Sequence, residues 1–442
     1  MNNKDARGVA LDALTAFRKR NARIEGYLKN EMGKNNLSRQ DSALATEIAN
    51  GVLQNMLYLD YCISCFSSIK INKISPGILD IMRASAYQIL FLDRVPDSAT
   101  VNDAVARAKR NNYKAGGFVN AVLRKLSAQK KDIPKPEGDS SYVMSVSYST
   151  PLSLVNALVR EYGEKVCEDI LRSNNEKVPT TIRVNTLKTT SEALIKSLSD
   201  KGLNAEKDIA EDSVRIASIG NIEKSDEFGN GLFYVQDTAS QLAAKTLSPK
   251  IGASVLDACA APGGKSFYMA MQMKNIGKIV SCDVFEHKLK LIDEGAKRLG
   301  INIITTEIRD ASEYDAEYDQ NFDFILADVP CSGFGIIRRK PDIRYKNADE
   351  TGELPSIQLK ILENLSEYVK KGGCILYSTC TILSRENSDV IRSFVSKRND
   401  FEEMSGDYPD IPHINNEYGV TFLPHLSGTD GFYMCKLRRK ND

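Results

Sequence analysis

Apolar residues between positions 5 and 128 recur three or four positions apart, which is the spacing of one buried stripe along a helix. They include Val9, Leu11, Leu14 and Phe17, then Ala45, Ile48, Val52 and Leu53, then Ile81, Ala84, Ile89 and Leu90. The stretch holds few glycines and shows no strand-like alternation. The pattern therefore predicts an all-α bundle as a first domain over residues 1–135.

Periodicity is lost from Ala128 to Ser141, where prolines, glycine and charged residues are mixed, and this composition is typical of a linker. Residues 142–235 then combine a helical run at 152–162 with strand-like runs at 181–184 and 233–235. This mixture predicts a small α+β domain.

Short apolar strands alternate with helical stretches in the remaining residues, 236–442. Strands are expected at 255–256, 278–283, 303–305, 322–328 and 374–377, and a last strand at 432–437 is expected to close an edge of the sheet. Strands and helices in alternation predict an α/β, Rossmann-like domain with a doubly wound parallel sheet. The expected protein is multidomain.

The composition predicts a soluble, intracellular protein. The first twenty residues are interrupted by charges, and no apolar run is long enough for a signal or membrane helix. The nine cysteines show no regular spacing, which favours reduced thiols in the cytoplasm over a disulfide framework. We expect a cytoplasmic protein that does not contact membranes.

Charge is unevenly distributed, although the net charge is only +1. The first 140 residues carry 22 Lys and Arg against 14 Asp and Glu, a net +8, and the other 302 carry 37 against 44, a net −7. A basic module of this kind is suited to a polyanion such as RNA. The densest basic cluster of the first domain consists of Arg107, Lys109, Arg110, Lys114, Arg124 and Lys125.

Gly263 and Gly264 lie between the first strand of the predicted sheet and the helix that follows it. Backbone N–H groups can approach a ligand there because no Cβ obstructs them. Asp283 ends the next strand, twenty positions after Gly263, at the spacing of a carboxylate that binds a ribose diol, and Asp310 follows the third strand. Together these residues predict a nucleoside cofactor.

Two other cofactor classes fit the sequence less well. A P-loop would need glycine where this chain has Cys259, and Pro262 lacks an N–H that a phosphate cradle would use. The G-x-G-x-x-G pattern of dinucleotide dehydrogenases is absent.

Two cysteines follow predicted strands at the same edge of the sheet. Cys331 lies in Asp328-Val-Pro-Cys-Ser-Gly333 and Cys380 in Tyr377-Ser-Thr-Cys-Thr381, so adjacent strands would bring both thiols into one cleft. We expect the others to be core residues: Cys62, Cys65, Cys167, Cys282, Cys374 and Cys435. The Cys62-x-x-Cys65 spacing also occurs in zinc sites, but no second pair completes four ligands, and we predict no metal.

A nucleoside cofactor, a thiolate and a carboxylate are the groups that methylation at C5 of a pyrimidine requires. That carbon becomes nucleophilic only after a thiolate adds to C6, and a base must later remove the C5 proton. Spacing alone leaves open which cysteine attacks.

These motifs resemble the RNA cytosine-C5 methyltransferases that use S-adenosylmethionine, in particular the bacterial 16S ribosomal RNA enzymes of the RsmB (Fmu or Sun) type. Phe118-Val-Asn-Ala-Val-Leu-Arg124 is similar to the signature of their NusB-like RNA-binding domain, and Arg183–Thr186 and Gln236–Ser240 resemble their middle-region motifs. The resemblance covers nearly the whole chain. It implies a partner in 16S rRNA, naked or in an early assembly particle, with no DNA substrate, and we expect a monomer.

The resemblance also implies roles for individual residues. Cys380 would be the nucleophile, and Cys331 would assist product release. Asp283 would bind the ribose and Asp310 the adenine region, while Asp328 would lie where cofactor and target base meet. The methionine side of the cofactor would be lined by Cys259, Ala260, Ala261, Pro262, Gly263, Gly264 and Lys265.

Further residues are candidates for RNA contact. The chain has no Trp, so stacking on a flipped base falls to a Tyr or Phe, with Phe334 as a candidate. A basic run after the Cys331 motif could grip phosphates or form a solvated basic loop: Arg338, Arg339, Lys340, Arg344 and Lys346. The alternative to an enzyme is a non-catalytic RNA-binding or ribosome assembly factor that retains the fold.

Overall fold

The computed structural model describes residues 4–20, 24–217, 222–346, 348 and 352–441. The chain forms two compact units. Unit 1 comprises Met1–Asn175 with Lys340–Asn347, and unit 2 comprises Glu176–Arg339 with Ala348–Asp442.

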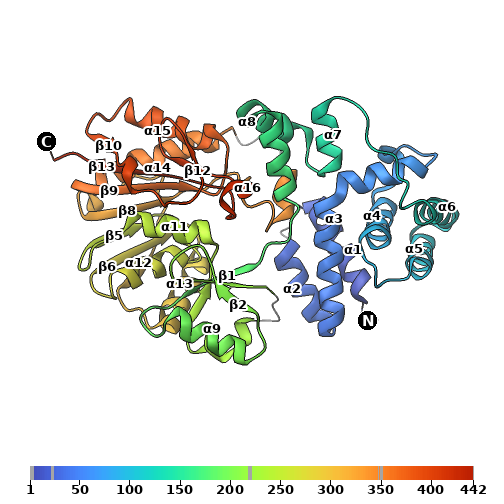
Figure 1. The fold of residues 1–442 in the computed structure, drawn as a ribbon, viewed down its shortest axis with the longest axis horizontal. Helices are drawn as coiled ribbons and strands as arrows, with labels where there is room; N and C mark the ends of the chain where they lie inside the picture. The colour runs from blue at the N-terminus through green and yellow to red at the C-terminus, as the bar shows by residue number, and fades with distance from the viewer. Residues whose placement is uncertain (1–3, 21–23, 218–221, 347, 349–351, 442) are drawn as a thin grey trace. The chain divides into compact units, whose positions relative to one another are not determined.

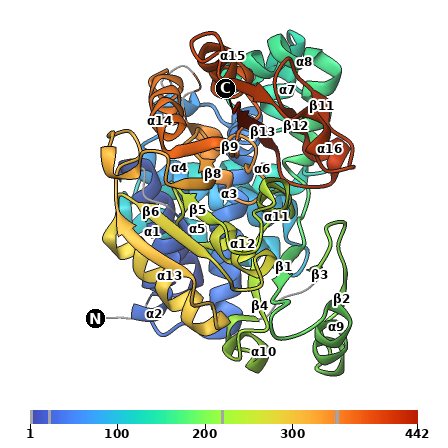
Figure 2. The same ribbon diagram turned by 90° about the vertical axis from the view of Figure 1, so that its left-hand side faces the viewer.

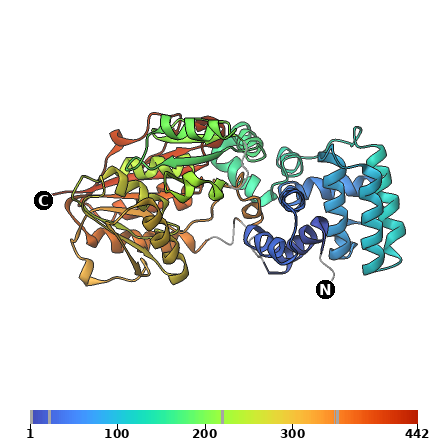
Figure 3. The same ribbon diagram turned by 90° about the horizontal axis from the view of Figure 1, so that it is seen from below.

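Unit 1 is helical, as the apolar spacing predicts (Figure 1). Its core consists of the apolar stripes of the helices, and Val9, Ile48, Val52, Leu53 and Ile81 are all buried in it. Helices α3 to α6 pack against one another (Figure 3). The helices are α1 (Ala6–Arg20), α2 (Ile24–Lys34), α3 (Arg39–Phe66), α4 (Pro76–Phe91), α5 (Asp97–Asn111), α6 (Ala115–Ala128), α7 (Ser140–Ser147) and α8 (Leu152–Ser173). Helices α7 and α8 therefore cluster with unit 1, whereas the sequence pattern places residues 142–175 with the α+β domain.

A short segment from the second half of the chain, Lys340–Asn347, also belongs to unit 1 and contains the 3-10 helix η4 (Pro341–Tyr345). Arg344 is fully buried and donates hydrogen bonds to backbone oxygens of Gln54, Tyr148 and Ser149, at 2.7 to 3.2 Å. The prediction that Arg344 grips phosphates is wrong, because the guanidinium satisfies buried carbonyl groups of unit 1 instead.

Unit 2 begins with a small antiparallel sheet in the order β2-β3-β1-β4. Apolar side chains of β1 and β3 and of helix α9 (Ser191–Asp200) form its core. The strands are β1 (Thr180–Val184), β2 (Ala205–Lys207), β3 (Ser213–Ile216) and β4 (Phe233–Val235), with α10 (Asp226–Gly229) before β4. This is the predicted α+β module.

The second sheet of unit 2 has the order β11-β12-β13-β9-β8-β5-β6-β7. Strands β7, β6, β5, β8 and β9 are parallel to their neighbours, and β13 runs antiparallel to β9. β13 also pairs with β12 and β10, so the prediction that it closes an edge is wrong. The strands are β5 (Ser254–Asp257), β6 (Lys278–Asp283), β7 (Ile304–Ile308), β8 (Phe322–Asp328), β9 (Val369–Thr379), β10 (Phe401–Glu403), β11 (Ile414–Asn415), β12 (Val420–Phe422) and β13 (Phe432–Arg439).

Helices cover both faces of this sheet, which confirms the doubly wound α/β fold (Figure 2). Helices α11 (Thr238–Leu247), α12 (Gly264–Gln272) and α13 (Glu286–Leu299) pack on one face, while α14 (Leu354–Tyr368) and α15 (Ser388–Val395) pack on the other. Successive residues Val255 and Leu256 of β5 belong to opposite faces, as the pleat of a strand requires. In the described part of the chain, no helix is both long and apolar enough to cross a membrane.

Candidate active site

Strand β5 lies at the centre of the parallel segment, where the chain order reverses between β6 on one side and β8 on the other. In doubly wound sheets this switch point opens a crevice at the carboxyl ends of the strands. Asp257, Asp283 and Asp328 end β5, β6 and β8 respectively, and Cys331 and Cys380 follow β8 and β9. The fold therefore gathers the residues that the motifs single out at one edge.

The loop between β5 and α12 requires its glycines. Gly263 has φ +101°, and a Cβ there would lie 2.7 Å from the ring of Phe267. A Cβ on Gly264 would come within 3.1 Å of the Gln236 side chain, and the Tyr234 hydroxyl donates to the Gly264 carbonyl oxygen at 2.9 Å. The small sheet, through β4 and the residue after it, thus supports the loop that presents the amino end of α12.

The carboxylates of the next two strands fit a nucleoside. Asp283 accepts a hydrogen bond from the Phe285 backbone N–H at 3.0 Å and lies 3.3 Å from the Lys288 ammonium, which fixes its orientation. Asp310 is exposed and lines an open pocket of about 480 Å³ together with Val284 and Ile308. A carboxylate for a diol beside a partly apolar pocket for a base is the arrangement that a nucleoside needs.

Asp257 is a buried carboxyl group of the site that the motif analysis did not single out. It accepts a hydrogen bond from the Ser266 hydroxyl at 2.6 Å, and Ser266 contacts the Ser281 hydroxyl at 2.8 Å. Burial raises the pKa of Asp257 to about 7. These bonds join β5, α12 and β6 beneath the glycine loop.

Lys265 and Asp328 connect the glycine loop to the cysteine motifs. The Lys265 ammonium lies 2.7 Å from one Asp328 oxygen, and the Ser378 hydroxyl donates to the other at 2.8 Å. Burial alone would lower the pKa of Lys265, but the Asp328 carboxylate outweighs it and raises the pKa, so the lysine remains charged. Asp328 is therefore held between two neighbours, neither of which the sequence identifies as its partner.

The two motif cysteines meet, as their positions on adjacent strands predict. The Sγ atoms of Cys331 and Cys380 lie 3.1 Å apart. The hydrogen bond between the thiols, together with burial and the neighbouring negative charges, raises the pKa of Cys331 well above its usual value. Burial likewise raises the pKa of Cys259 well above its usual value.

The remaining cysteines are mostly core residues, as expected. Cys65 is the exception, because it is exposed near the carboxyl end of α3. Buried positions are occupied by Cys62, Cys167, Cys282, Cys374 and Cys435.

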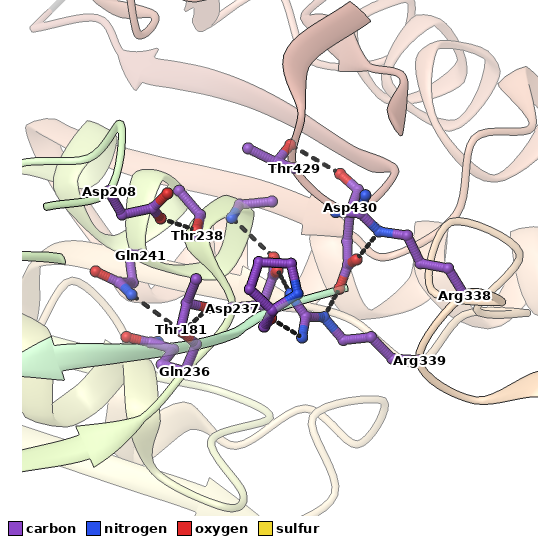
Figure 4. A network of polar contacts seen from close by, with 12 residues as sticks. Thr181, Asp208, Gln236, Asp237, Thr238, Gln241, Arg338, Arg339, Thr429 and Asp430 are labelled. Atoms are coloured by element: carbon purple, nitrogen blue, oxygen red, sulfur yellow. Dashed lines mark hydrogen bonds and ion pairs between the residues drawn. The ribbon is translucent and has the colours of Figure 1, made fainter. Parts of the chain in front are cut away.

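Three residues expected to contact RNA have other roles. Arg338 pairs with Asp430, and Arg339 bridges Asp430 and Asp237 at 2.6 and 2.8 Å (Figure 4). Phe334 is buried, so it offers no face for stacking on a base. The phosphate prediction is wrong for both arginines, because their charges are neutralised inside unit 2, where they fix the loop that follows Cys331.

The basic cluster of unit 1 separates into paired and unpaired cations. Arg107 forms ion pairs with Asp5 and Asp103. Among the described residues, no ion pair involves the five other cations, which are all exposed on α5, α6 and the turn between them: Lys109, Arg110, Lys114, Arg124 and Lys125. Tyr113 in that turn is 78% exposed, with the Lys109 ammonium 5.6 Å from its ring centre. This surface carries free positive charge beside an aromatic ring.

Comparison with known proteins finds three family models that match successive regions of the chain. Residues 244–438 match the family described as 16S rRNA methyltransferase RsmB/F, residues 4–128 match the NusB family, and residues 150–223 match the ferredoxin-like domain of RsmF/B-like methyltransferases.

Curated relatives match over almost their full length. The chain is 39% identical to the probable ribosomal RNA small subunit methyltransferase B of Bacillus subtilis, over all of both proteins. It is 30% identical to ribosomal RNA small subunit methyltransferase B of Shigella sonnei, over 91% of this chain and 92% of that protein.

Solved structures show the same architecture. The crystal structure of PH0851 is 25% identical, with 98% of each chain covered and a TM-score of 0.78. A methyltransferase homolog from Pyrococcus horikoshii is 26% identical over 69% of this chain and all of that one, with a TM-score of 0.61. The chain belongs to the ribosomal RNA small subunit methyltransferase B family, the RsmB type of rRNA methyltransferase.

Proposed function

We propose that the protein transfers a methyl group from S-adenosylmethionine to C5 of a cytosine in 16S ribosomal RNA, through a covalent bond between Cys380 Sγ and C6 of the base. The observation that carries this proposal is the pair of thiols 3.1 Å apart, beside a carboxylate that is tied to the glycine loop. A covalent step at the base requires a thiolate nucleophile, and two adjacent thiols supply one together with a second group for the later proton removal.

The residues present fit the cofactor. Gly263 and Gly264 leave the backbone of the α12 amino end open to the methionine portion, Asp283 suits the ribose, and Asp310 borders a pocket for the adenine. Cys259 to Lys265 form the loop that would line the methionine side. When bound, S-adenosylmethionine supplies an electrophilic methyl group.

The proposed steps for the protein's own residues follow from the thiol pair. The Cys380 thiolate forms the S–C6 bond, and the electron pair of the C5–C6 double bond becomes available at C5 for the methyl group. Cys331, which must be a thiolate at this point, then accepts the C5 proton and later releases it to solvent, the electrons restore the double bond, and the S–C6 bond breaks to return the Cys380 thiolate. Asp328, held by Lys265 and Ser378, keeps its remaining lone pairs for an N–H of the base.

The unpaired cations on α5 and α6 support an RNA partner for unit 1. Five unneutralised cations can contact phosphates, and exposed Tyr113 offers a face for an unstacked base.

Methyl transfer tests the proposal directly. Wild-type protein with methyl-labelled S-adenosylmethionine and 16S rRNA should give labelled 5-methylcytidine, detected by mass spectrometry after nuclease digestion. Cys380→Ala should give none but should still bind S-adenosylmethionine in calorimetry, since the substitution leaves Gly263, Gly264 and Asp283 in place. Label on another atom, or activity in Cys380→Ala, would refute the mechanism, and RNA binding without any product in wild type would favour a non-catalytic assembly factor.

A further inference from the structure

Two consecutive buried polar residues, Glu386 and Asn387, contact the loops that carry the two active-site cysteines. Glu386 ends the 3-10 helix η6 (Ser384–Glu386) and Asn387 precedes α15, six and seven positions after Cys380. Both side chains are almost completely buried. Neither residue belongs to the motifs that carry the chemistry.

Glu386 holds the Cys331 loop on both sides of the cysteine. Its Oε2 atom accepts a hydrogen bond from the Ser332 backbone N–H at 2.8 Å and another from the Gln358 side chain at 3.2 Å. Gln358, on α14, also donates to the Pro330 carbonyl oxygen at 2.9 Å. The residues directly before and after Cys331 are thus fixed, one by Glu386 and the other through Gln358.

Asn387 holds the Cys380 loop on both sides of that cysteine. Its Oδ1 atom accepts a hydrogen bond from the Thr379 hydroxyl at 2.6 Å, and its Nδ2 donates to the Thr381 carbonyl oxygen at 3.1 Å. The residues directly before and after Cys380 are therefore fixed by one side chain. A hydrogen bond of 2.8 Å between the Ser332 and Thr381 hydroxyls joins the two loops.

Burying the Glu386 carboxyl group costs free energy, and it has few partners that offset this cost. Among the described residues, no Lys or Arg forms an ion pair with this carboxylate, and its Oε1 atom has no hydrogen-bond partner. Buried carboxylates normally have a cation or several donors, because leaving water costs free energy. The Glu386 carboxyl group instead accepts hydrogen bonds from the backbone N–H of Ser332, next to Cys331, and from Gln358, so its contacts are concentrated on the Cys331 loop.

We propose that Glu386 and Asn387 are positioning residues that separately set the two thiols, Glu386 for Cys331 and Asn387 for Cys380. This assignment rests on the proposed function for its catalytic meaning. It predicts that the two side chains control different steps: Asn387 the attack on C6, and Glu386 the release of the methylated base.

Covalent adducts separate the two steps. With ordinary 16S rRNA, Glu386→Ala should accumulate the protein–RNA adduct on denaturing gels, because a displaced Cys331 slows release. With RNA containing 5-fluorocytidine, whose adduct cannot be released, its rate of adduct formation should stay close to wild type. Asn387→Ala should show the reverse, with adduct formation slowed about 10- to 100-fold and no accumulation on ordinary RNA.

Conservative and control variants distinguish positioning from general damage. Glu386→Gln keeps an acceptor oxygen at the same place and should restore most of the release rate. Gln358→Met removes the bonds to Pro330 and to Glu386 but leaves the bond from the Ser332 N–H to Glu386, so it should give a weaker version of Glu386→Ala. Asp389→Ala, which removes an exposed carboxylate from the first turn of α15, should change neither step. Parallel loss of both steps in Glu386→Ala and Asn387→Ala would overturn the proposal.

Thiol alkylation tests the positioning even if no methylation mechanism applies. In the folded protein treated with iodoacetamide and analysed by peptide mass spectrometry, Glu386→Ala should change the alkylation rate of Cys331 several-fold more than that of Cys380, and Asn387→Ala should do the opposite. Equal changes at both cysteines, or no change, would overturn the proposal. An absent adduct in wild type with this selective alkylation would refute the proposed function and leave the positioning roles established.

Discussion

Single residues of the site owe their chemistry to burial more than to sequence position. Asp257, Lys265 and Cys331 lie at the same edge of the sheet, and burial together with close neighbours shifts the pKa of each. In Lys265 the Asp328 carboxylate preserves the charge, whereas in Asp257 burial favours the neutral form. One crevice thus stabilises different protonation states side by side.

Asp257 makes stability depend on pH. Its folded-state pKa of about 7 lies above the value of about 3.9 in an unfolded chain, so between these limits the folded protein keeps a proton that the unfolded chain has lost. The stabilisation from this proton is complete below pH ~4 and disappears as pH rises through about 7. Between pH 5 and pH 8, wild type should lose roughly 2 to 3 kcal/mol more unfolding free energy than Asp257→Asn, measured by urea denaturation. Equal losses in the two proteins would show that Asp257 is already ionised at pH 5.

Sequence motifs identify most residues of the site but not their partners. Cys331, Cys380, Asp283 and Asp328 are found because they end strands in recognisable motifs. Ser378, Glu386 and Gln358 contribute through hydrogen bonds to residues distant in sequence, and no local pattern predicts such bonds. Arg338 and Arg339 mislead for the same reason, since the acidic residues that neutralise them, Asp237 and Asp430, lie about a hundred positions away on either side.

At the scale of elements, the turn from β5 into α12 is the most constrained connection in the site. Its glycines combine a left-handed backbone at Gly263 with close packing against Phe267 and Gln236. The sequence predicts this turn because a glycine pair between a strand and a helix allows a left-handed backbone and leaves the N–H groups open to a ligand. The role of β4 as a support, through the Tyr234 hydroxyl, follows only from the tertiary structure.

Gly263→Ala should damage the loop more than a matched change elsewhere. Gly252 also has a positive φ, of +85°, but a Cβ there meets nothing within 4 Å. Gly252→Ala should therefore carry only the backbone cost, about 1 kcal/mol, while Gly263→Ala adds a clash worth about 1 to 3 kcal/mol. Urea denaturation measures the difference, and calorimetry should show weaker S-adenosylmethionine binding for Gly263→Ala alone. Equal stability losses in the two variants would mean that the Phe267 ring moves aside freely.

Element prediction fails mainly where pairing is not local. The helices of unit 1 and the parallel strands follow from apolar spacing, and strands β6 and β8 have the expected bounds. β13 is internal rather than terminal because β12 and β10, only three residues each, pair with its two ends along the edge opposite β9. Strands that short carry too little pattern to be recognised from sequence.

At the scale of the whole molecule, part of the positive charge of unit 1 is neutralised within the unit. Arg18, Arg83 and Arg107 are paired with aspartates, whereas the other cations clustered on α5, α6 and the turn between them form no ion pair among the described residues. The charge imbalance of the sequence therefore predicts a basic module correctly, but the location of usable charge depends on which pairs form. Arg344 illustrates the limit, since a residue far along the chain is buried inside unit 1.

Salt dependence of RNA binding tests this surface. The triple variant Lys109→Ala, Lys114→Ala and Lys125→Ala should weaken binding and reduce the slope of log affinity against log salt by about 2 to 3, because each lost phosphate contact removes roughly 0.7 to 0.9. A triple variant of ion-paired lysines in the same unit has the same net charge and should leave the slope unchanged: Lys4→Ala, Lys34→Ala and Lys165→Ala. Identical slopes for the two variants would show that net charge, and not this surface, drives binding.

Covalent trapping tests the central proposal, that Cys380 attacks the base. Wild type, Cys331→Ser and Cys380→Ser are each incubated with S-adenosylmethionine and 16S rRNA containing 5-fluorocytidine, then separated on a denaturing gel. Fluorine at C5 blocks proton removal, so wild type and Cys331→Ser should give a stable protein–RNA adduct, and Cys380→Ser should give none. An adduct that persists in Cys380→Ser and disappears in Cys331→Ser would reverse the roles of the two cysteines and contradict the proposed mechanism.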